Sequence, residues 1–297
     1  MANLKEVRER IRTVKNTMQI TSAMKMVSAA KLRRAQMAIV EMRPYADKLD
    51  AMLRNILSNL EGDANTSFNL ERPLQRAALV IVTSNRGLAG AFNTNVIKSA
   101  VACIKEQLAD AKEIDIYPIG KKGADYFRRR LDEDSRVNLV EDYIGLFEDL
   151  SFDHTKQVPQ LLMDSFEKGD YDRIYTSYSR FRNAAVQYPT TVQFLPVPPA
   201  EVSEEDGNIK ADYIFEPSKE ELLSTLVPSI LQTQFQKFLL DTHASEHGAR
   251  MTAMDSATEN AKELQRELKI SYNKARQEAI TKEILEIVGG AAALEDA

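Results

Sequence analysis

The first sixty residues carry an apolar repeat whose length limits what this chain can fold into. Apolar side chains recur from Leu4 to Leu60 in alternating steps of three and four residues, and only three of the seventeen positions are polar. A repeat sustained for about eight heptads is typical of a coiled coil, and at 1.5 Å per residue it predicts a helix about 85 Å long. An ordinary core helix of about 8 to 20 residues does not account for it, because no helix-ending signal precedes Gly62.

The three polar positions of the repeat follow one another as Thr21, Lys25 and Ser28. Beside them, Ile20 and Val27 move the apolar surface onto a neighbouring stripe. We therefore expect this part of the helix to face something besides its partner helix.

Positive charge also gathers on this helix. Residues 1–60 carry a formal charge of +7 in a chain whose total is −5, so the remainder carries −12. A solvated basic face would explain the charge alone, but its coincidence with the polar break favours an anionic partner. The alternative function is a basic coiled-coil nucleic-acid-binding protein, since residues 5–34 hold nine basic and two acidic side chains. That alternative requires an affinity that falls steeply with salt, and the negative total charge gives it no support.

The period changes after a polar linker at 61–76, and residues 77–200 are predicted to form a small α/β domain. Buried strands are expected at 79–83 and 114–119 with a helix at about 93–112 between them, which is a βαβ unit. Further helices are expected around 121–131 and 155–168, and further strands at 173–178 and 185–195.

The turn at 84–93 follows the first strand, where doubly wound folds bind phosphates. It lacks both the Gly-x-Gly-x-x-Gly spacing and a Gly-Lys-Ser/Thr sequence, so we favour tight packing of strand against helix over a nucleotide site. A nucleotide-using enzyme remains the less favoured hypothesis, and no cofactor is predicted.

A second long helix is predicted at 218–297, after an acidic linker at 201–217. Apolar residues recur along it at helical spacing, and a kink is expected near Pro228 because an interior proline loses a backbone hydrogen bond. Two such helices at opposite chain ends should pair antiparallel. The predicted fold class is therefore α+β, with a long antiparallel α-helical coiled coil from the two termini (helices 1–60 and 218–297) and a small open, Rossmann-like α/β sheet domain.

Three further features bear on whether the chain binds a metal, forms a disulfide or spans a membrane. His243, Glu246 and His247 match the His-x-x-Glu-His pattern of some zinc proteases, but no third ligand is apparent and an exposed polar helix face is the favoured interpretation. Cys103 is the single cysteine and can form no internal disulfide. The longest apolar run, at 77–82, is far short of the roughly 20 residues of a membrane span.

The segment from Ile280 to Ala293, Ile-Thr-Lys-Glu-Ile-Leu-Glu-Ile-Val-Gly-Gly-Ala-Ala-Ala, resembles the signature of the gamma subunit of rotary F-type ATP synthases. Similar motifs of that family occur along essentially the whole chain. They are Ile20 to Val27, Arg43-Pro44-Tyr45, Arg86-Gly87-Leu88-x-Gly90, Ala244 to Met251 and Ser271 to Gln277. Asn85 and Ala89 depart from the Asp and Cys that relatives often carry.

This resemblance implies a non-catalytic rotor shaft that couples proton flow through the membrane to ATP synthesis and hydrolysis. The implied partners are the alpha and beta subunits, which form a hexamer around the coiled coil, the epsilon and delta subunits and the ring of membrane c subunits, with no nucleic acid. The implied place is the cytoplasmic side of a bacterial inner membrane, where the protein would be peripheral.

The resemblance also implies where the shaft touches its surroundings. The resemblance assigns a contact with the beta subunits, here called the catch, to Arg276, Gln277 and Thr281. Met24, Lys25 and Arg250 are implied as neighbouring contacts. The small apolar tip would turn in a hydrophobic sleeve; it consists of Ala291, Ala292, Ala293 and Leu294.

Overall fold

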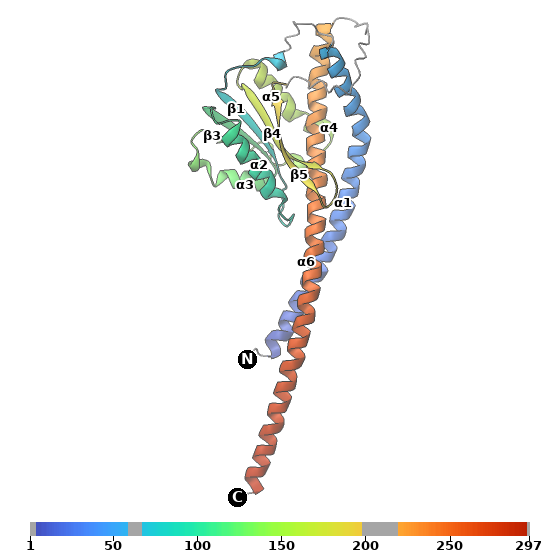
Figure 1. Ribbon diagram of the computed structural model, residues 1–297, viewed down its shortest axis with the longest axis vertical. Helices are drawn as coiled ribbons and strands as arrows, with labels where there is room; N and C mark the ends of the chain where they lie inside the picture. The colour runs from blue at the N-terminus through green and yellow to red at the C-terminus, as the bar shows by residue number, and fades with distance from the viewer. Residues whose placement is uncertain (1–3, 59–66, 198–218, 296–297) are drawn as a thin grey trace. The chain divides into compact units, whose positions relative to one another are not determined.

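A computed structural model describes residues 4–58, 67–197 and 219–295. Two long helices carry the chain ends: α1 spans Leu4–Ser58 and α6 spans Lys219–Glu295 (Figure 1). The chain forms two compact units. The first unit consists of residues 1–28 and 251–297, and the second of residues 29–250, so each long helix contributes to both. Of the predicted linker at 61–76, residues 61–66 lie outside the described residues, as do the predicted linker at 201–217 and residue 218 of the predicted second helix.

In the first unit, α1 and α6 pair antiparallel, as predicted. Arg8 Nη2 donates to Tyr272 Oη at 2.7 Å, while farther along α1 the Thr21 and Thr258 hydroxyls are 2.8 Å apart. Residue numbers therefore rise along α1 as they fall along α6. Continuing this register places Leu4 level with about residue 276.

The polar break in the repeat of α1 faces α6. Thr21 and Thr258 are both buried, and Lys25 Nζ forms an ion pair with Asp255 Oδ1 at 2.5 Å. α6 thus offers polar groups that match Thr21 and Lys25, and the expectation that this stretch also faces something besides its partner helix stays a prediction. Such polar contacts inside an otherwise apolar seam favour one register over its neighbours.

The second unit contains a five-stranded sheet in the order β3-β2-β1-β4-β5. The strands are β1 (Arg76–Val82), β2 (Glu113–Ile119), β3 (Val137–Leu139), β4 (Arg173–Phe181) and β5 (Gln187–Leu195). All neighbours are parallel except β4 and β5. The parallel part has the 3-2-1-4 order of doubly wound folds, which confirms the predicted Rossmann-like sheet.

Helices connect and cover these strands. They are α2 (Phe92–Glu106), α3 (Lys121–Arg128), α4 (Phe152–Thr155) and α5 (Gln157–Lys168), with short 3-10 turns η1 (Ser67–Asn69), η2 (Leu131–Glu133) and η3 (Leu146–Glu148). The predicted strands are all present. The sequence did not predict β3, because a strand of three residues is too short for its alternation to stand out.

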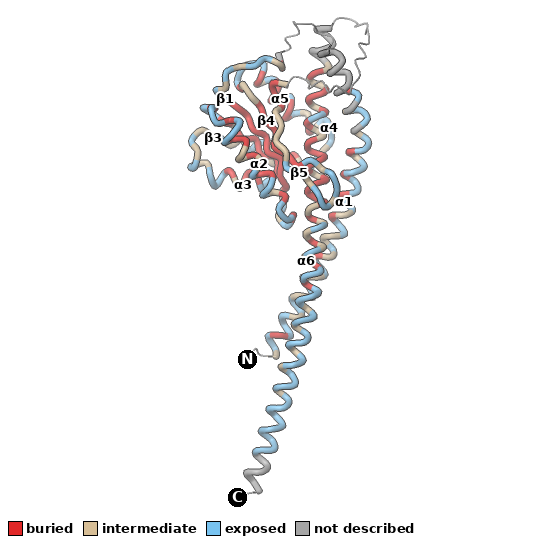
Figure 2. Tube along the Cα trace, in the orientation of Figure 1, coloured by how far each residue is buried: buried red, intermediate tan, exposed pale blue. Residues whose placement is uncertain are grey.

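The continuous apolar run of β1 is explained by burial of both sheet faces. Ala77, Leu79 and Ile81 pack with α2, whereas Val80 and Val82 pack with α5 and α6. Within α6, Phe235 and Leu239 are fully buried in the same cluster as Val80 and Val82. Figure 2 shows the buried parts of the sheet and of α6 in red. The stretch of α6 up to residue 250 is therefore a core helix of the α/β fold. The helix continues through Pro228, so the expected kink does not interrupt it.

Gly248 marks a close approach of α6 to the turn between β4 and β5. A Cβ atom at Gly248 would lie 3.2 Å from Ala184 Cα and 3.4 Å from the Ala184 carbonyl oxygen. Glycine inside a helix usually costs up to about 1 kcal/mol relative to alanine. Here the missing side chain allows two backbones to approach.

We expect Gly248→Val to lower the free energy of unfolding by about 1 to 3 kcal/mol, because the added side chain overpacks this contact. Gly289 provides the control, since a Cβ atom there meets nothing within 4 Å and Gly289→Ala should stabilise by up to about 1 kcal/mol. Urea denaturation of both variants measures the difference. A Gly248→Val variant as stable as the parent would contradict the close-approach explanation.

Candidate functional site: the junction of α6 with the β1 turn and the free end of α6

The turn after β1 lies at the carboxyl end of the central strand, where β2 and β4 flank β1 on opposite sides. Asn93 closes the turn: its Oδ1 accepts from the Ser84 backbone N–H at 3.0 Å and its Nδ2 donates to Ser84 Oγ at 2.8 Å. Leu88 and Gly90 have left-handed φ angles of 62° and 57°. In doubly wound folds this position binds phosphate groups through backbone N–H groups.

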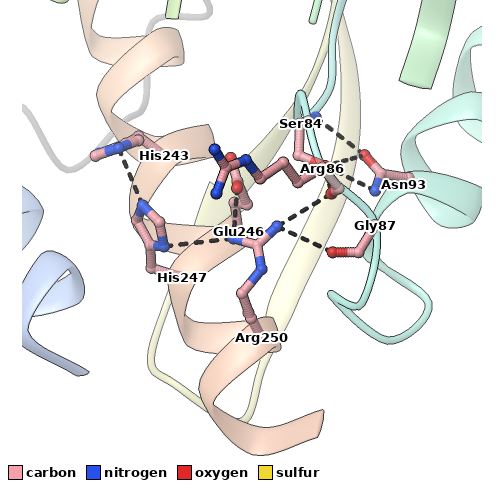
Figure 3. Close-up of polar contacts among 8 residues, drawn as sticks. All are labelled: Ser84, Arg86, Gly87, Asn93, His243, Glu246, His247 and Arg250. Atoms are coloured by element: carbon pink, nitrogen blue, oxygen red, sulfur yellow. Dashed lines mark hydrogen bonds and ion pairs between the residues drawn. The ribbon is translucent and has the colours of Figure 1, made fainter. Parts of the chain in front are cut away.

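In this chain, α6 presents a cation to the same turn (Figure 3). Arg250 Nη2 donates to the backbone carbonyl oxygens of Arg86 at 3.1 Å and Gly87 at 3.3 Å. Its Nη1 forms an ion pair with Glu246 Oε1 at 2.5 Å, and both side chains are about nine-tenths buried. The turn thus offers carbonyl oxygens to a guanidinium, which is the opposite polarity to a phosphate site. The geometry supports the packing interpretation of residues 84–93.

Two imidazoles continue the contacts of Arg250 along α6: His247 lies next to Arg250, and His243 lies next to His247. His247 Nε2 and His243 Nε2 are 3.1 Å apart, and the His243 ring stacks on Phe147. Burial is the main cause that lowers the pKa of His243 to about 4 and that of His247 to about 3. The expectation of an exposed polar face at 243–247 is wrong, because Glu246 and His247 are 8% and 5% exposed.

The His-x-x-Glu-His pattern holds these groups in contacts with one another and with Arg250. Among the described residues there is no group of three or more His, Cys, Asp or Glu side chains placed to hold a metal ion. The i, i+4 spacing of Glu246 and Arg250 could have predicted their ion pair from the sequence. Nothing local pointed to the Arg86 and Gly87 carbonyl groups.

The residues assigned to the catch lie elsewhere on α6. Arg276, Gln277 and Thr281 are exposed, and Thr281 Oγ1 donates to the Gln277 carbonyl oxygen at 2.9 Å. They cover about 140° of the helix circumference, beside the half-buried stripe that includes Tyr272 and Ala275. The structure thus brings these three together on one side of α6.

The neighbouring contacts do not join them in one cluster. Met24 and Lys25 are half-buried, and Asp255, the partner of Lys25, precedes Arg276 by about 30 Å of helix. Arg250 is buried in the second unit. The side chains of the predicted tip, Ala291 to Leu294, lie outside the described residues.

The last turns of α6 extend beyond the start of the described part of α1. From about residue 277 onward, that part of α1 offers α6 no partner. Large apolar side chains are nevertheless exposed there, at 45% to 71%: Ile280, Ile284, Leu285, Ile287 and Val288. None of the described helices has a stretch long and apolar enough to span a bilayer. Exposed apolar side chains gathered in this way are typical of an interaction surface.

Comparison with known proteins identifies the family. The chain matches the ATP synthase family over residues 3–294. The ATP synthase gamma chain of Flavobacterium psychrophilum is 52% identical over 295 residues, covering 99% of this chain and 100% of that relative. The gamma chain of Cytophaga hutchinsonii is 52% identical over 300 residues and covers 100% of both chains.

A solved structure shares the fold. One chain of the Euglena gracilis mitochondrial ATP synthase, in the cryo-EM structure of OSCP/F1/c-ring in rotational state 3, superposes with a TM-score of 0.63 at 21% identity. The match covers 98% of this chain and 94% of that one. With the family match and the full-length relatives in agreement, this chain belongs to the family of ATP synthase gamma chains.

Proposed function

We propose that the exposed end of α6 works inside the hexamer of alpha and beta subunits, where it transmits torque. As a gamma chain, the protein is a non-catalytic rotor subunit of ATP synthase. The observation that carries the proposal is the row of unpartnered apolar side chains beyond residue 276. A hexamer with an apolar sleeve would cover them, and the small tip residues Ala291 to Leu294 would turn there with few specific bonds to break.

The catch is assigned to Arg276, Gln277 and Thr281. A guanidinium and an amide offer several donors to carboxylates and carbonyl groups of the beta subunits. The rod is asymmetric, because these polar groups lie on one side of α6 only. It therefore makes different contacts with each of three surrounding sites and favours a different conformation at each.

Two of the neighbouring contacts keep their proposed role, and one changes. Met24 and Lys25 are half-buried and remain proposed contacts with the hexamer. Arg250 is bound within its own chain, to Glu246 and to the turn after β1. We therefore propose that Arg250 positions the turn relative to α6.

The remaining partners and the location are proposed on the same family basis. The solved relatives come from an OSCP/F1/c-ring assembly and from a rotor of the Euglena gracilis mitochondrial ATP synthase. We assign the epsilon and delta subunits and the c-ring as partners, at the cytoplasmic side of a bacterial inner membrane. Family membership supports the rotor function and gives no support to the nucleic-acid-binding alternative.

Reconstitution tests this function. The chain is mixed with the alpha and beta subunits of the same organism, and a bead is attached through Lys105→Cys in a Cys103→Ser background. Lys105 is exposed, whereas the single native thiol is buried. We expect a stable complex in which ATP hydrolysis rotates the bead. A chain that elutes apart from the hexamer, or a complex that hydrolyses ATP without rotation, would refute the proposal.

A further inference from the structure

We propose that His243 and His247 position Arg250 on the turn after β1 and make its hold on that turn sensitive to acid. The inference concerns the second unit alone and does not depend on the contacts assigned to the hexamer. It rests on a continuous row of contacts that begins where Phe147 in η3 stacks on His243. From His243 the row continues through His247 and Arg250 to the carbonyl groups of Arg86 and Gly87 (Figure 3).

The contacts fix the protons of the pair. Arg250 Nη1 lies 3.5 Å from His247 Nδ1. A guanidinium can only donate, so His247 Nδ1 accepts and the single ring proton of His247 lies on Nε2. That proton is donated to His243 Nε2 at 3.1 Å, which leaves the His243 proton on Nδ1. The row therefore works only with both imidazoles neutral.

Protonation of either imidazole removes one of the hydrogen bonds in this row of contacts. On His247 it would put an N–H at Nδ1, facing the N–H of Arg250. On His243 it would put an N–H at Nε2, facing the N–H of His247. In both cases two donors oppose each other, and a positive charge appears beside Arg250.

The surrounding elements do not compensate such a charge. Lys31 from α1 and Arg250 from α6 both oppose it, and Phe147 from η3 is uncharged. Glu246 is the acidic group in the cluster, and Arg250 already holds its carboxylate. Burial together with these cations keeps the pKa of both rings well below the usual 6.5.

Proton linkage sets the sign and the size of the effect. A ring that is released when the junction opens regains a pKa near 6.5 and binds a proton below that pH. The closed state, in which Arg250 is bound to the turn after β1, is therefore most stable relative to the open state above about pH 6.5. Its stability decreases as the pH falls below that value. Between pH 7.5 and pH 5.5 the open population should rise about 10-fold for each imidazole released, hence about 100-fold for both.

Hydrogen exchange on the full-length chain tests the proposal. Exchange of the peptides covering 84–93 and 243–250 is measured at pH 7.5 and pH 5.5 and corrected for the intrinsic rate. We expect the open population of the parent chain to rise about 100-fold. In His243→Gln/His247→Gln the side chains stay polar but do not titrate, so the open population should change less than about 3-fold between the two pH values.

Two more variants keep the test decisive. His154→Gln replaces the third histidine of the chain, which is half-buried in α4 and lies outside the row of contacts, and should leave the 100-fold rise intact. His247→Asn retains an acceptor for Arg250 and removes one titrating ring, so the rise should fall to about 10-fold; it also serves if the double variant does not fold. An acid response that is absent in the parent chain, or that persists in the double variant, would overturn the proposal.

Discussion

Replacing both Arg276 and Gln277 with alanine should slow ATP hydrolysis and ATP synthesis by the assembled complex about 10- to 100-fold, with the subunit stoichiometry unchanged. Each charge-assisted hydrogen bond lost is worth about 1.5 to 3 kcal/mol, and every 1.4 kcal/mol corresponds to a factor of ten. The chain should stay folded. Both side chains are exposed beside the half-buried stripe of α6, and such substitutions usually change stability by about 0.5 kcal/mol or less.

A matched control lies on the opposite flank of the same stripe. Glu278 and Lys282 are also exposed and charged, and at about 100° per residue they point away from the catch side. Glu278→Ala/Lys282→Ala should therefore leave turnover within about 2-fold of the parent. Turnover at the parent rate from a correctly assembled Arg276→Ala/Gln277→Ala complex would show that torque is not exchanged at these positions.

Replacing Arg250 with alanine should lower the free energy of unfolding by about 3 to 5 kcal/mol. The substitution leaves the Glu246 carboxylate buried without its cation, and breaking a buried pair from one side has a cost of this size. It also removes the donor from two carbonyl groups of the turn after β1. Urea or thermal denaturation of the full-length chain measures the loss.

Two comparisons separate this loss from a general effect of removing an arginine. Glu246→Leu/Arg250→Leu removes both charges and should recover more than half of the stability lost in Arg250→Ala. Arg128→Ala removes an ion-paired arginine that is 51% exposed and should cost about 1 kcal/mol or less. Equal losses for Arg128→Ala and Arg250→Ala would mean that burial of the Glu246 pair is not the cause.

The sequence determined those features that short-range periodicity encodes. Steps of three and four residues from Leu4 onward determined a long helix with one apolar seam, and the apolar run of β1 followed by a helical stretch determined a βαβ unit. The C-terminal motif and its companions along the chain determined the family. In each case the signal lies in the order of residues along the chain, so no knowledge of distant contacts is needed.

Only the tertiary structure decided what each polar or small residue in those helices does. Thr21 and Lys25 interrupt the apolar repeat, but the repeat does not show that residues more than two hundred positions away pair with them. Glycine is unfavourable inside a helix, yet the missing Cβ of Gly248 allows the backbone of Ala184 to approach. The same sequence period would fit either outcome, because periodicity records which side of a helix is apolar and not what lies opposite.

The junction of α6 with the turn after β1 shows the same division. The i, i+4 spacing of Glu246 and Arg250 is visible in the sequence, but their burial follows from the packing of α6 against the sheet, to which Phe235 and Leu239 contribute. Packing brought the Arg86 and Gly87 carbonyl groups to the guanidinium and removed His247 from water. Burial and partnership are properties of segments that meet across more than 150 residues of chain, and the local sequence of neither segment specifies the other.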